Sequence, residues 1–278
     1  MTFAIVPDGP IQFFQFDLKI KEFPRISTVF VETQHPNPQD GGSDWHLTCL
    51  GVQDEALVDL VTGQPLLAAD GSIATDHPEQ FSVSLPSVLQ QFTGRWIPLP
   101  YLRLAGSINA QQRRFWPNAP TDWCRLFLSA SENDVMRCVL AFDPKVEPGP
   151  EKHDIPPNEG FPTLSKHDVD EAGHFALASH PRDIAWFLSL NWIKDWLKSF
   201  NKPRRSESVG SQTDHIAKYV ALLEILEKSE KLPDARVVNP STLKPVDVDL
   251  VLDIGNSRSI GMLIERRSGE NSNLSDGA

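Results

Sequence analysis

The residues best suited to chemistry lie near the end of the printed sequence, in a short polar segment between two apolar runs. Gly255 lets the backbone turn tightly and approach a ligand, and Asn256, Ser257 and Ser259 offer amide and hydroxyl groups to phosphate oxygens. Asp253 ends the first run, where a carboxylate could hold a hydrated magnesium ion beside those phosphates. These residue types predict a loop that binds nucleotide phosphates.

The two apolar runs, 250–252 and 260–264, are the elements that would position this loop. A continuous apolar run fits a strand that is covered on both faces, as in an α/β sheet, better than it fits an edge strand. The sequence therefore predicts a β-hairpin over residues 246–265, followed by a flexible polar tail over residues 266–278. The alternative is an ordinary hairpin turn with no role in phosphate binding.

The stretch VDVDLVLDIGNSRSIGMLIE, residues 246–265, resembles known proteins at two levels. Residues 253–259 look like the first phosphate loop of the actin, sugar-kinase and heat-shock-chaperone superfamily, in which a hairpin opens the ATPase domain. The whole stretch, after a long N-terminal region, is similar to SrfB, a family of large bacterial proteins associated with virulence. The resemblance implies a magnesium-dependent ATP site with Asp253 on the metal side. The resemblance also implies that four residues surround the phosphates: Gly255, Asn256, Ser257 and Ser259.

The same resemblance implies that the nucleotide site of this chain is incomplete. An ATPase of that superfamily also needs a second phosphate loop, an adenosine-binding segment and a second lobe, and only residues 254–278 follow Asp253. One hairpin cannot enclose ATP or place an attacking water, so we expect no catalysis by this chain alone. We expect ATP and magnesium only in a full-length form, with this N-terminal portion acting as a binding or scaffolding module. The alternative is a self-contained interaction domain without nucleotide chemistry, in which residues 246–265 complete its own sheet.

The region before the hairpin predicts an α+β fold, beginning with a β-rich domain over residues 1–142. Short runs of β-branched and aromatic residues predict strands there, and the Asp-Gly pair at 70–71 predicts a tight turn. The expected strands cover residues 11–20, 26–32, 45–52, 81–85, 123–130 and 135–142.

A Pro-rich segment over residues 143–168 predicts a linker, because closely spaced prolines prevent regular hydrogen-bonded structure. Residues 169–240 then form a predicted helical segment. Apolar residues recur every three or four positions over 181–200, after a proline in the first turn, and again over 213–231. Each of these last two ranges is predicted to form one helix.

Three other clusters have a chemical and a structural interpretation. The stretch HDVDEAGH, residues 167–174, contains metal-ligand types, but its spacing matches no metal motif, so we predict a solvated loop that caps a following helix. Three tryptophans within 186–196 could form a membrane or partner face, although core packing is favoured. A basic patch over residues 198–205 is a weak lead to an acidic partner or a phosphate; it consists of Lys198, Lys202, Arg204 and Arg205.

Composition restricts the class of partner. The 278 residues carry 37 acidic and 26 basic side chains, and the net charge of −11 disfavours nucleic acids and anionic membrane surfaces. Three dispersed cysteines are typical of reduced thiols in the cytoplasm. No run reaches the roughly 18 apolar residues that a membrane span needs. We therefore expect a cytoplasmic chain without a transmembrane segment, whose partners are proteins.

Overall fold

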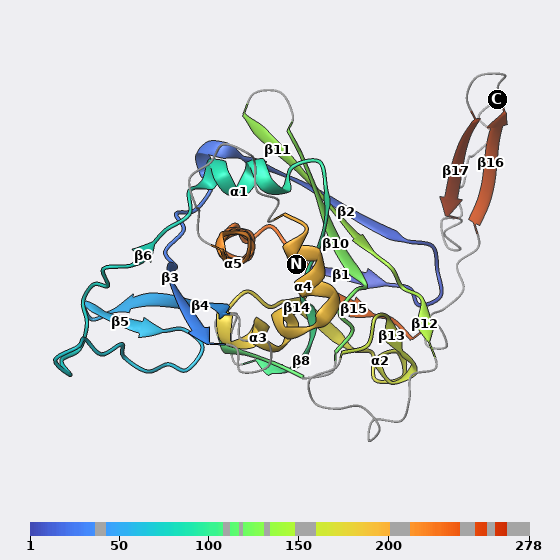
Figure 1. The fold of residues 1–278 in the computed structure, drawn as a ribbon. Coiled ribbons are helices and arrows are strands. Elements are labelled where there is room, and N and C mark those ends of the chain that lie inside the picture. The colour runs from blue at the N-terminus through green and yellow to red at the C-terminus, as the bar shows by residue number, and fades with distance from the viewer. Residues whose placement is uncertain are drawn as a thin grey trace, which may run out of the picture. The chain divides into compact units, whose positions relative to one another are not determined.

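The computed structural model describes residues 1–36, 43–107, 112–116, 119–130, 134–147, 160–200, 212–239, 248–254 and 259–265. The chain divides into two compact units, Met1–Asn239 and Pro240–Ala278, which are considered separately. The described part of the first unit combines three larger sheets, which are antiparallel or mixed, and one two-stranded parallel sheet with helices (Figure 1). The α+β class with a β-rich start is therefore confirmed.

The first sheet joins the beginning and the end of this unit. Its strand order is β1-β15-β14-β8-β9, and β1 runs parallel to β15 while the other neighbours are antiparallel. Its strands are β1 (Thr2–Ile5), β15 (Asp234–Val237), β14 (His174–Leu177), β8 (Tyr101–Ser107) and β9 (Arg113–Phe115).

The second sheet is antiparallel throughout, with the order β2-β11-β10-β7. It consists of β2 (Gln12–Lys19), β11 (Val135–Phe142), β10 (Cys124–Ala130) and β7 (Trp96–Pro98). The third sheet has the order β5-β4-β3-β6 and consists of β5 (Ala56–Asp59), β4 (Ser43–Gln53), β3 (Val29–Pro36) and β6 (Gln80–Phe81). The predicted strands at 11–20, 45–52, 123–130 and 135–142 correspond closely to β2, β4, β10 and β11.

Helix α5 (Asp214–Lys228) lies at the centre of the core and agrees with the helix predicted over 213–231. It contacts α1 (Leu85–Phe92), α4 (Asn191–Lys198) and β4 (Figure 1). It is buried around most of its circumference, because its apolar residues continue well beyond a single stripe. The remaining helices are α3 (Pro181–Ser189), the short α2 (Lys166–Asp170) and the 3₁₀ turn η1 (Ile20–Glu22).

Two element predictions were wrong. The strand expected over 81–85 ends at Phe81, and α1 follows it, because the Ser84 hydroxyl caps the helix by accepting from the Ser87 N–H. The single helix expected over 181–200 is two helices, since Leu190 adopts an extended conformation with ψ 133° between α3 and α4. The apolar periodicity continues across this break, so the sequence pattern contained no stop signal.

The Pro-rich segment lies partly outside the described residues, which resume at Gly160. Its ends are paired, because β12 (Val146–Glu147) runs parallel to β13 (Leu164–Ser165). Side chains from either side of this segment share one core, and the Trp123 and Phe175 rings lie 4.8 Å apart. The subdivision of the chain at residues 142 and 168 stays a prediction.

The predicted turn at Asp70-Gly71 is present. Gly71 has a φ of +82°, a conformation that glycine adopts without strain, and the Asp70 carboxylate accepts from the Ser72 N–H at 2.9 Å.

In the second unit, β16 (Val248–Ile254) and β17 (Ser259–Glu265) form an antiparallel two-stranded sheet of their own. The hairpin predicted over residues 246–265 is therefore present within its described residues.

Candidate functional site

The predicted phosphate loop connects the two strands of this second unit. In the ladder, Ile254 lies opposite Ser259, and Asp253 lies opposite Ile260. The candidate residues Asp253 and Ser259 are therefore both at the loop end of the hairpin. Gly255, Asn256 and Ser257 fall outside the described residues. The backbone thus brings Asp253 and Ser259 together, on either side of the connecting segment 255–258. The magnesium and phosphate roles of these five residues stay predictions.

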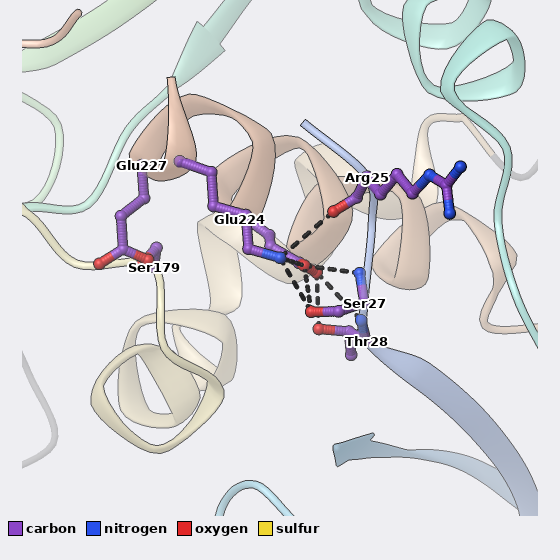
Figure 2. A network of polar contacts seen from close by, with 7 residues as sticks. Arg25, Ser27, Thr28, Ser179, Glu224 and Glu227 are labelled. Carbon is purple, nitrogen blue, oxygen red and sulfur yellow. Dashed lines mark hydrogen bonds and ion pairs between the residues drawn. The ribbon is translucent and has the colours of Figure 1, made fainter. Parts of the chain in front are cut away.

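A second polar cluster lies in the first unit, on the last turns of α5 (Figure 2). Glu224 is buried, and its carboxylate points at the segment that precedes β3. Oε1 accepts from the Ser27 N–H and hydroxyl, each at 2.7 Å, and Oε2 accepts from the Thr28 N–H at 3.2 Å and hydroxyl at 2.7 Å. We refer to Ser27, Thr28, Glu224 and Lys228 as the α5 clasp. These hydrogen bonds connect α5 to the segment before β3, which is far from it in the sequence.

Lys228 completes the clasp as a hydrogen-bond donor. Its ammonium group lies 2.5 Å from Glu224 Oε1, 2.9 Å from Ser27 Oγ and 3.2 Å from the Arg25 carbonyl oxygen. A serine hydroxyl beside a lysine amine can serve nucleophilic catalysis when the amine is neutral and accepts the proton. Here the lysine is ion-paired and donates to three acceptors, so it cannot act as that base. The clasp stabilises the fold and is not a catalytic dyad.

The protonation behaviour of Glu224 agrees with this structural role. Burial by itself raises the pKa of a carboxyl group, but the hydrogen bonds from Lys228, Ser27 and Thr28 outweigh burial and lower the pKa of Glu224. The Glu224 carboxylate is therefore ionised at neutral pH, and in that form it accepts the hydrogen bonds from Ser27, Thr28 and Lys228.

One turn further along α5, Glu227 points in a different direction and accepts from the hydroxyl of the buried Ser179 (Figure 2). Both residues line a cavity of about 300 Å³. Its other lining residues, from β9, the end of β14 and the start of α3, are Arg113, Phe115, Leu177, His180, Arg182 and Asp183.

The two arginines that line this cavity already have carboxylate partners. Arg113 lies 2.9 Å from Asp234, and Arg182 lies 3.6 Å from Asp183. His180 caps α3 by accepting from the Arg182 N–H through Nδ1 at 3.3 Å, which leaves the proton of the neutral ring on Nε2. Burial lowers the pKa of His180 and so favours that neutral form. The Ser179 hydroxyl donates to a carboxylate, so these residues do not form a serine-histidine nucleophile.

The stretch 167–174 is not the solvated loop that was predicted. It lies partly within α2, whose N-terminus has a capping box formed by Ser165 and Asp168. Asp168 is buried and pairs with Arg103 at 3.2 Å. Across the described residues, no group of three or more histidine, cysteine, aspartate or glutamate side chains could hold a metal ion.

The three tryptophans contribute to core packing, as the structural interpretation predicted. Trp186, Trp192 and Trp196 pack against the main core, and the Trp196 ring stacks on Phe92 with centroids 6.2 Å apart. In the basic patch, Lys198 ends α4, while the other three residues lie outside the described part of the chain.

The three cysteines are buried and free. Burial raises the pKa of Cys49 and of Cys138 to about 12, and it raises the pKa of Cys124 as well. They are protonated at neutral pH and have no nucleophilic character there.

Sequence reasoning did not predict the α5 clasp. Its only local signal was the Glu-Lys pair at positions 224 and 228, whose spacing is typical of exposed helical ion pairs. Ser27 and Thr28 lie in an unremarkable segment before a strand, and nothing in their spacing connects them to α5.

Comparison with known proteins assigns the family. The family model described as virulence factor SrfB matches residues 2–278. Neither the curated proteins nor the solved structures gave a match. Within the described residues, no helix combines the length and apolar character that crossing a membrane requires. The chain therefore belongs to the SrfB family of virulence factors.

Proposed function

We propose that this SrfB protein combines a protein-binding module, residues 1–239, with the first phosphate-binding hairpin of an actin-like ATPase domain. In a full-length form, ATP and magnesium would bind at that hairpin and at later segments, and the nucleotide state would switch a virulence-associated complex between conformations. The chain of 278 residues would by itself bind partners without hydrolysing nucleotide.

The observation that supports the nucleotide part of the proposal is the register of β16 and β17. The ladder closes at Ile254 and Ser259, which leaves only residues 255–258 to connect the strands. A short connection of this kind, between a carboxylate and hydroxyl groups, is what a phosphate loop needs so that its backbone can approach the ligand.

Magnesium-ATP binding measured by calorimetry tests this proposal. In a chain that continues past Ala278 into a second Asp-x-Gly loop, we expect micromolar binding that Asp253→Ala abolishes. Asp249→Ala is the matched control, because it removes a carboxylate from the same strand at a distance from the loop. Equal binding by the two variants, or no binding by the longer chain, would contradict the nucleotide role.

For residues 1–278 alone we expect no measurable magnesium-ATP binding, since the second phosphate loop and the adenosine-binding segment are needed to enclose the ligand. Micromolar binding that Asp253→Ala removes would show instead that this chain contains a complete site.

The second candidate is an interaction domain without nucleotide chemistry. It is favoured by the core of residues 1–239, which unites the first and last strands of that unit in one sheet. A longer chain that binds partner proteins but no magnesium-ATP would favour this candidate.

A further inference from the structure

The second sheet of the first unit ends in an unusually long edge strand. Among the described residues, β2 pairs with β11 on one side and with no strand on the other. It contains eight residues, whereas the edge strands β1, β5, β6, β7 and β9 contain two to four. A long edge exposes a row of backbone donors and acceptors to a possible strand partner.

The register identifies the unpaired backbone groups. The Ile20 N–H donates to the Asp134 carbonyl at 2.8 Å, immediately after the pair formed by Lys19 and Val135. In an antiparallel ladder the N–H and C=O of one residue point to the same side, and this side alternates along the strand. The even-numbered residues of β2 therefore bond to β11. The odd-numbered residues direct their backbone groups away from the sheet; these are Phe13, Gln15, Asp17 and Lys19.

The side chains of β2 also leave room for a neighbour. Phe14 and Phe16 face the core but are only partly buried, and Phe13 on the opposite face is 59% exposed. An added strand would cover all three aromatic rings and would satisfy the outward backbone groups at the same time.

Little protects this edge from pairing. Natural edge strands are blocked by prolines, bulges or charges. The ladder of β2 has a continuous register, the strand contains no proline, and its charges are confined to Asp17 and Lys19 near one end. Residues 12–16 carry no charge at all.

We infer that β2 is a docking edge for an extended segment of a partner protein, which adds a fifth strand to this sheet. The segment would carry apolar residues opposite Phe14 and Phe16, a basic residue opposite Asp17 and an acidic residue opposite Lys19. This inference rests on the binding-module part of the proposed function and is independent of the nucleotide part.

Charge argues against a second copy of the chain as the occupant. Consider two copies of β2 that pair in an antiparallel manner through the outward backbone groups of their odd-numbered residues. Asp17 of one copy then lies opposite Lys19 of the other in a single register, in which only residues 17–19 of each strand are paired. Longer overlaps place Asp17 opposite Phe13, Gln15 or the other Asp17. They add no cross-strand partner to the exposed pairs that the chain already forms, Asp17 with Arg137 at 3.8 Å and Lys19 with Glu22 at 2.9 Å, and in the last register the two Asp17 carboxylates repel.

The probe is a fluorescein-labelled peptide that copies β11, Val135–Phe142, because this sequence already complements β2 on the other side. Two changes are introduced in the peptide, Val135→Glu and Cys138→Ala. In the register of β11 the peptide then sets an acid opposite Lys19, keeps an arginine opposite Asp17 and keeps an apolar residue opposite Phe16. Binding to the 278-residue chain is followed by fluorescence polarisation, with a scrambled peptide as the control. We expect saturable binding of the probe below roughly 1 mM and none of the scrambled peptide.

Two variants locate the binding at the edge. Gln15→Pro removes one outward N–H at an exposed position where proline is compatible with an edge strand, and it should weaken binding about tenfold or more, while Gln15→Ala should stay within about twofold. Asp17→Lys should reverse the preference towards a peptide whose arginine is replaced by glutamate, which keeps the inference testable if Gln15→Pro does not fold.

Three outcomes would overturn the inference. The first is equal affinity of the probe for the wild type and for a folded Gln15→Pro chain. The second is the absence of saturable binding. The third is a concentration-dependent dimer in sedimentation that Gln15→Pro disperses, because the occupant would then be a second copy. Magnesium-ATP binding is measured separately, so failure of the docking edge and failure of the nucleotide hairpin are distinguishable.

Discussion

Two hairpins of this chain have ladders of the same length but differ in what pairs with them. The ladder between β10 and β11 runs from Cys124 opposite Phe142 to Ala130 opposite Met136, and the ladder between β16 and β17 runs from Val248 opposite Glu265 to Ile254 opposite Ser259. In the first unit, β7 and β2 flank the hairpin, and its inner face is part of the main core. In the second unit, the described strands form a two-stranded sheet.

An apolar pattern and a hairpin register do not by themselves make a stable sheet. A two-stranded hairpin is marginal in water, whereas further strands and a covered face supply the buried area that offsets chain entropy. We therefore expect the second hairpin to need additional strands for its stability, as the first hairpin has β2 and β7 beside it.

Hydrogen exchange should give the largest contrast between the two hairpins. We expect the central amides of β10 and β11 to exchange only on global unfolding, and those of β16 and β17 to exchange faster by on the order of 10³-fold or more. Mass spectrometry of the intact 278-residue chain, with peptide-level resolution, measures both in one sample. Equal protection would mean that the second hairpin is stabilised as well as the first.

A pair of matched leucine substitutions should give the next largest effect. Leu126 in β10 is fully buried, so Leu126→Ala should lower the free energy of unfolding of the first unit by about 2–5 kcal/mol. All seven tryptophans precede residue 240, so urea unfolding followed by tryptophan fluorescence reports on the first unit alone.

Leu252→Ala in β16 is the control, and we expect it to change that transition by less than about 0.5 kcal/mol, because the two strands belong to separate units. A large shift in the Leu252→Ala chain would show that the first unit needs the second hairpin.

Removing the charge of the α5 clasp should have a smaller effect on the first unit. Glu224→Gln replaces acceptors of charge-assisted hydrogen bonds and leaves Lys228 without its ion-pair partner, which should cost about 2–3 kcal/mol at pH 7. Glu227→Gln, one turn away and more exposed, should cost less than about 1 kcal/mol. Urea unfolding of the two variants measures the difference.

The pH dependence of this difference follows from the lowered pKa of Glu224. A carboxyl group with a depressed folded-state pKa contributes stability that is fully present above its unfolded value, here 4.5, and is lost as the pH falls through the folded value. The destabilisation by Glu224→Gln should therefore be constant between pH 7 and pH 5 and shrink below pH 4.5. A difference that grows on acidification would contradict the clasp as described.

Much of the fold was predictable because its signals are local. The strands β2, β4, β10 and β11 and the helix α5 have apolar repeats that match the period of the element. The boundary within residues 181–200 was not predictable, because the same repeat runs through Leu190 and only the packing of α3 and α4 requires an extended residue there. The polar residues differ in the same way. Asp253 and Ser259 were proposed as site residues from one short motif, whereas Ser27 and Glu224 come together only on folding.

The amino-acid sequence by itself determined the class of the chain, its resemblance to SrfB, and the hairpin that carries the candidate phosphate loop. These properties depend on residue type and on spacing over a few positions, where backbone geometry leaves few choices. The tertiary structure alone decided that α5 lies inside the core and that Glu224 joins α5 to the segment before β3. It also decided that β2 has no strand beside its outer edge among the described residues. Each of these features depends on contacts between residues far apart in the sequence. Such contacts form only where buried area and hydrogen bonds, summed over the whole unit, offset the loss of chain entropy.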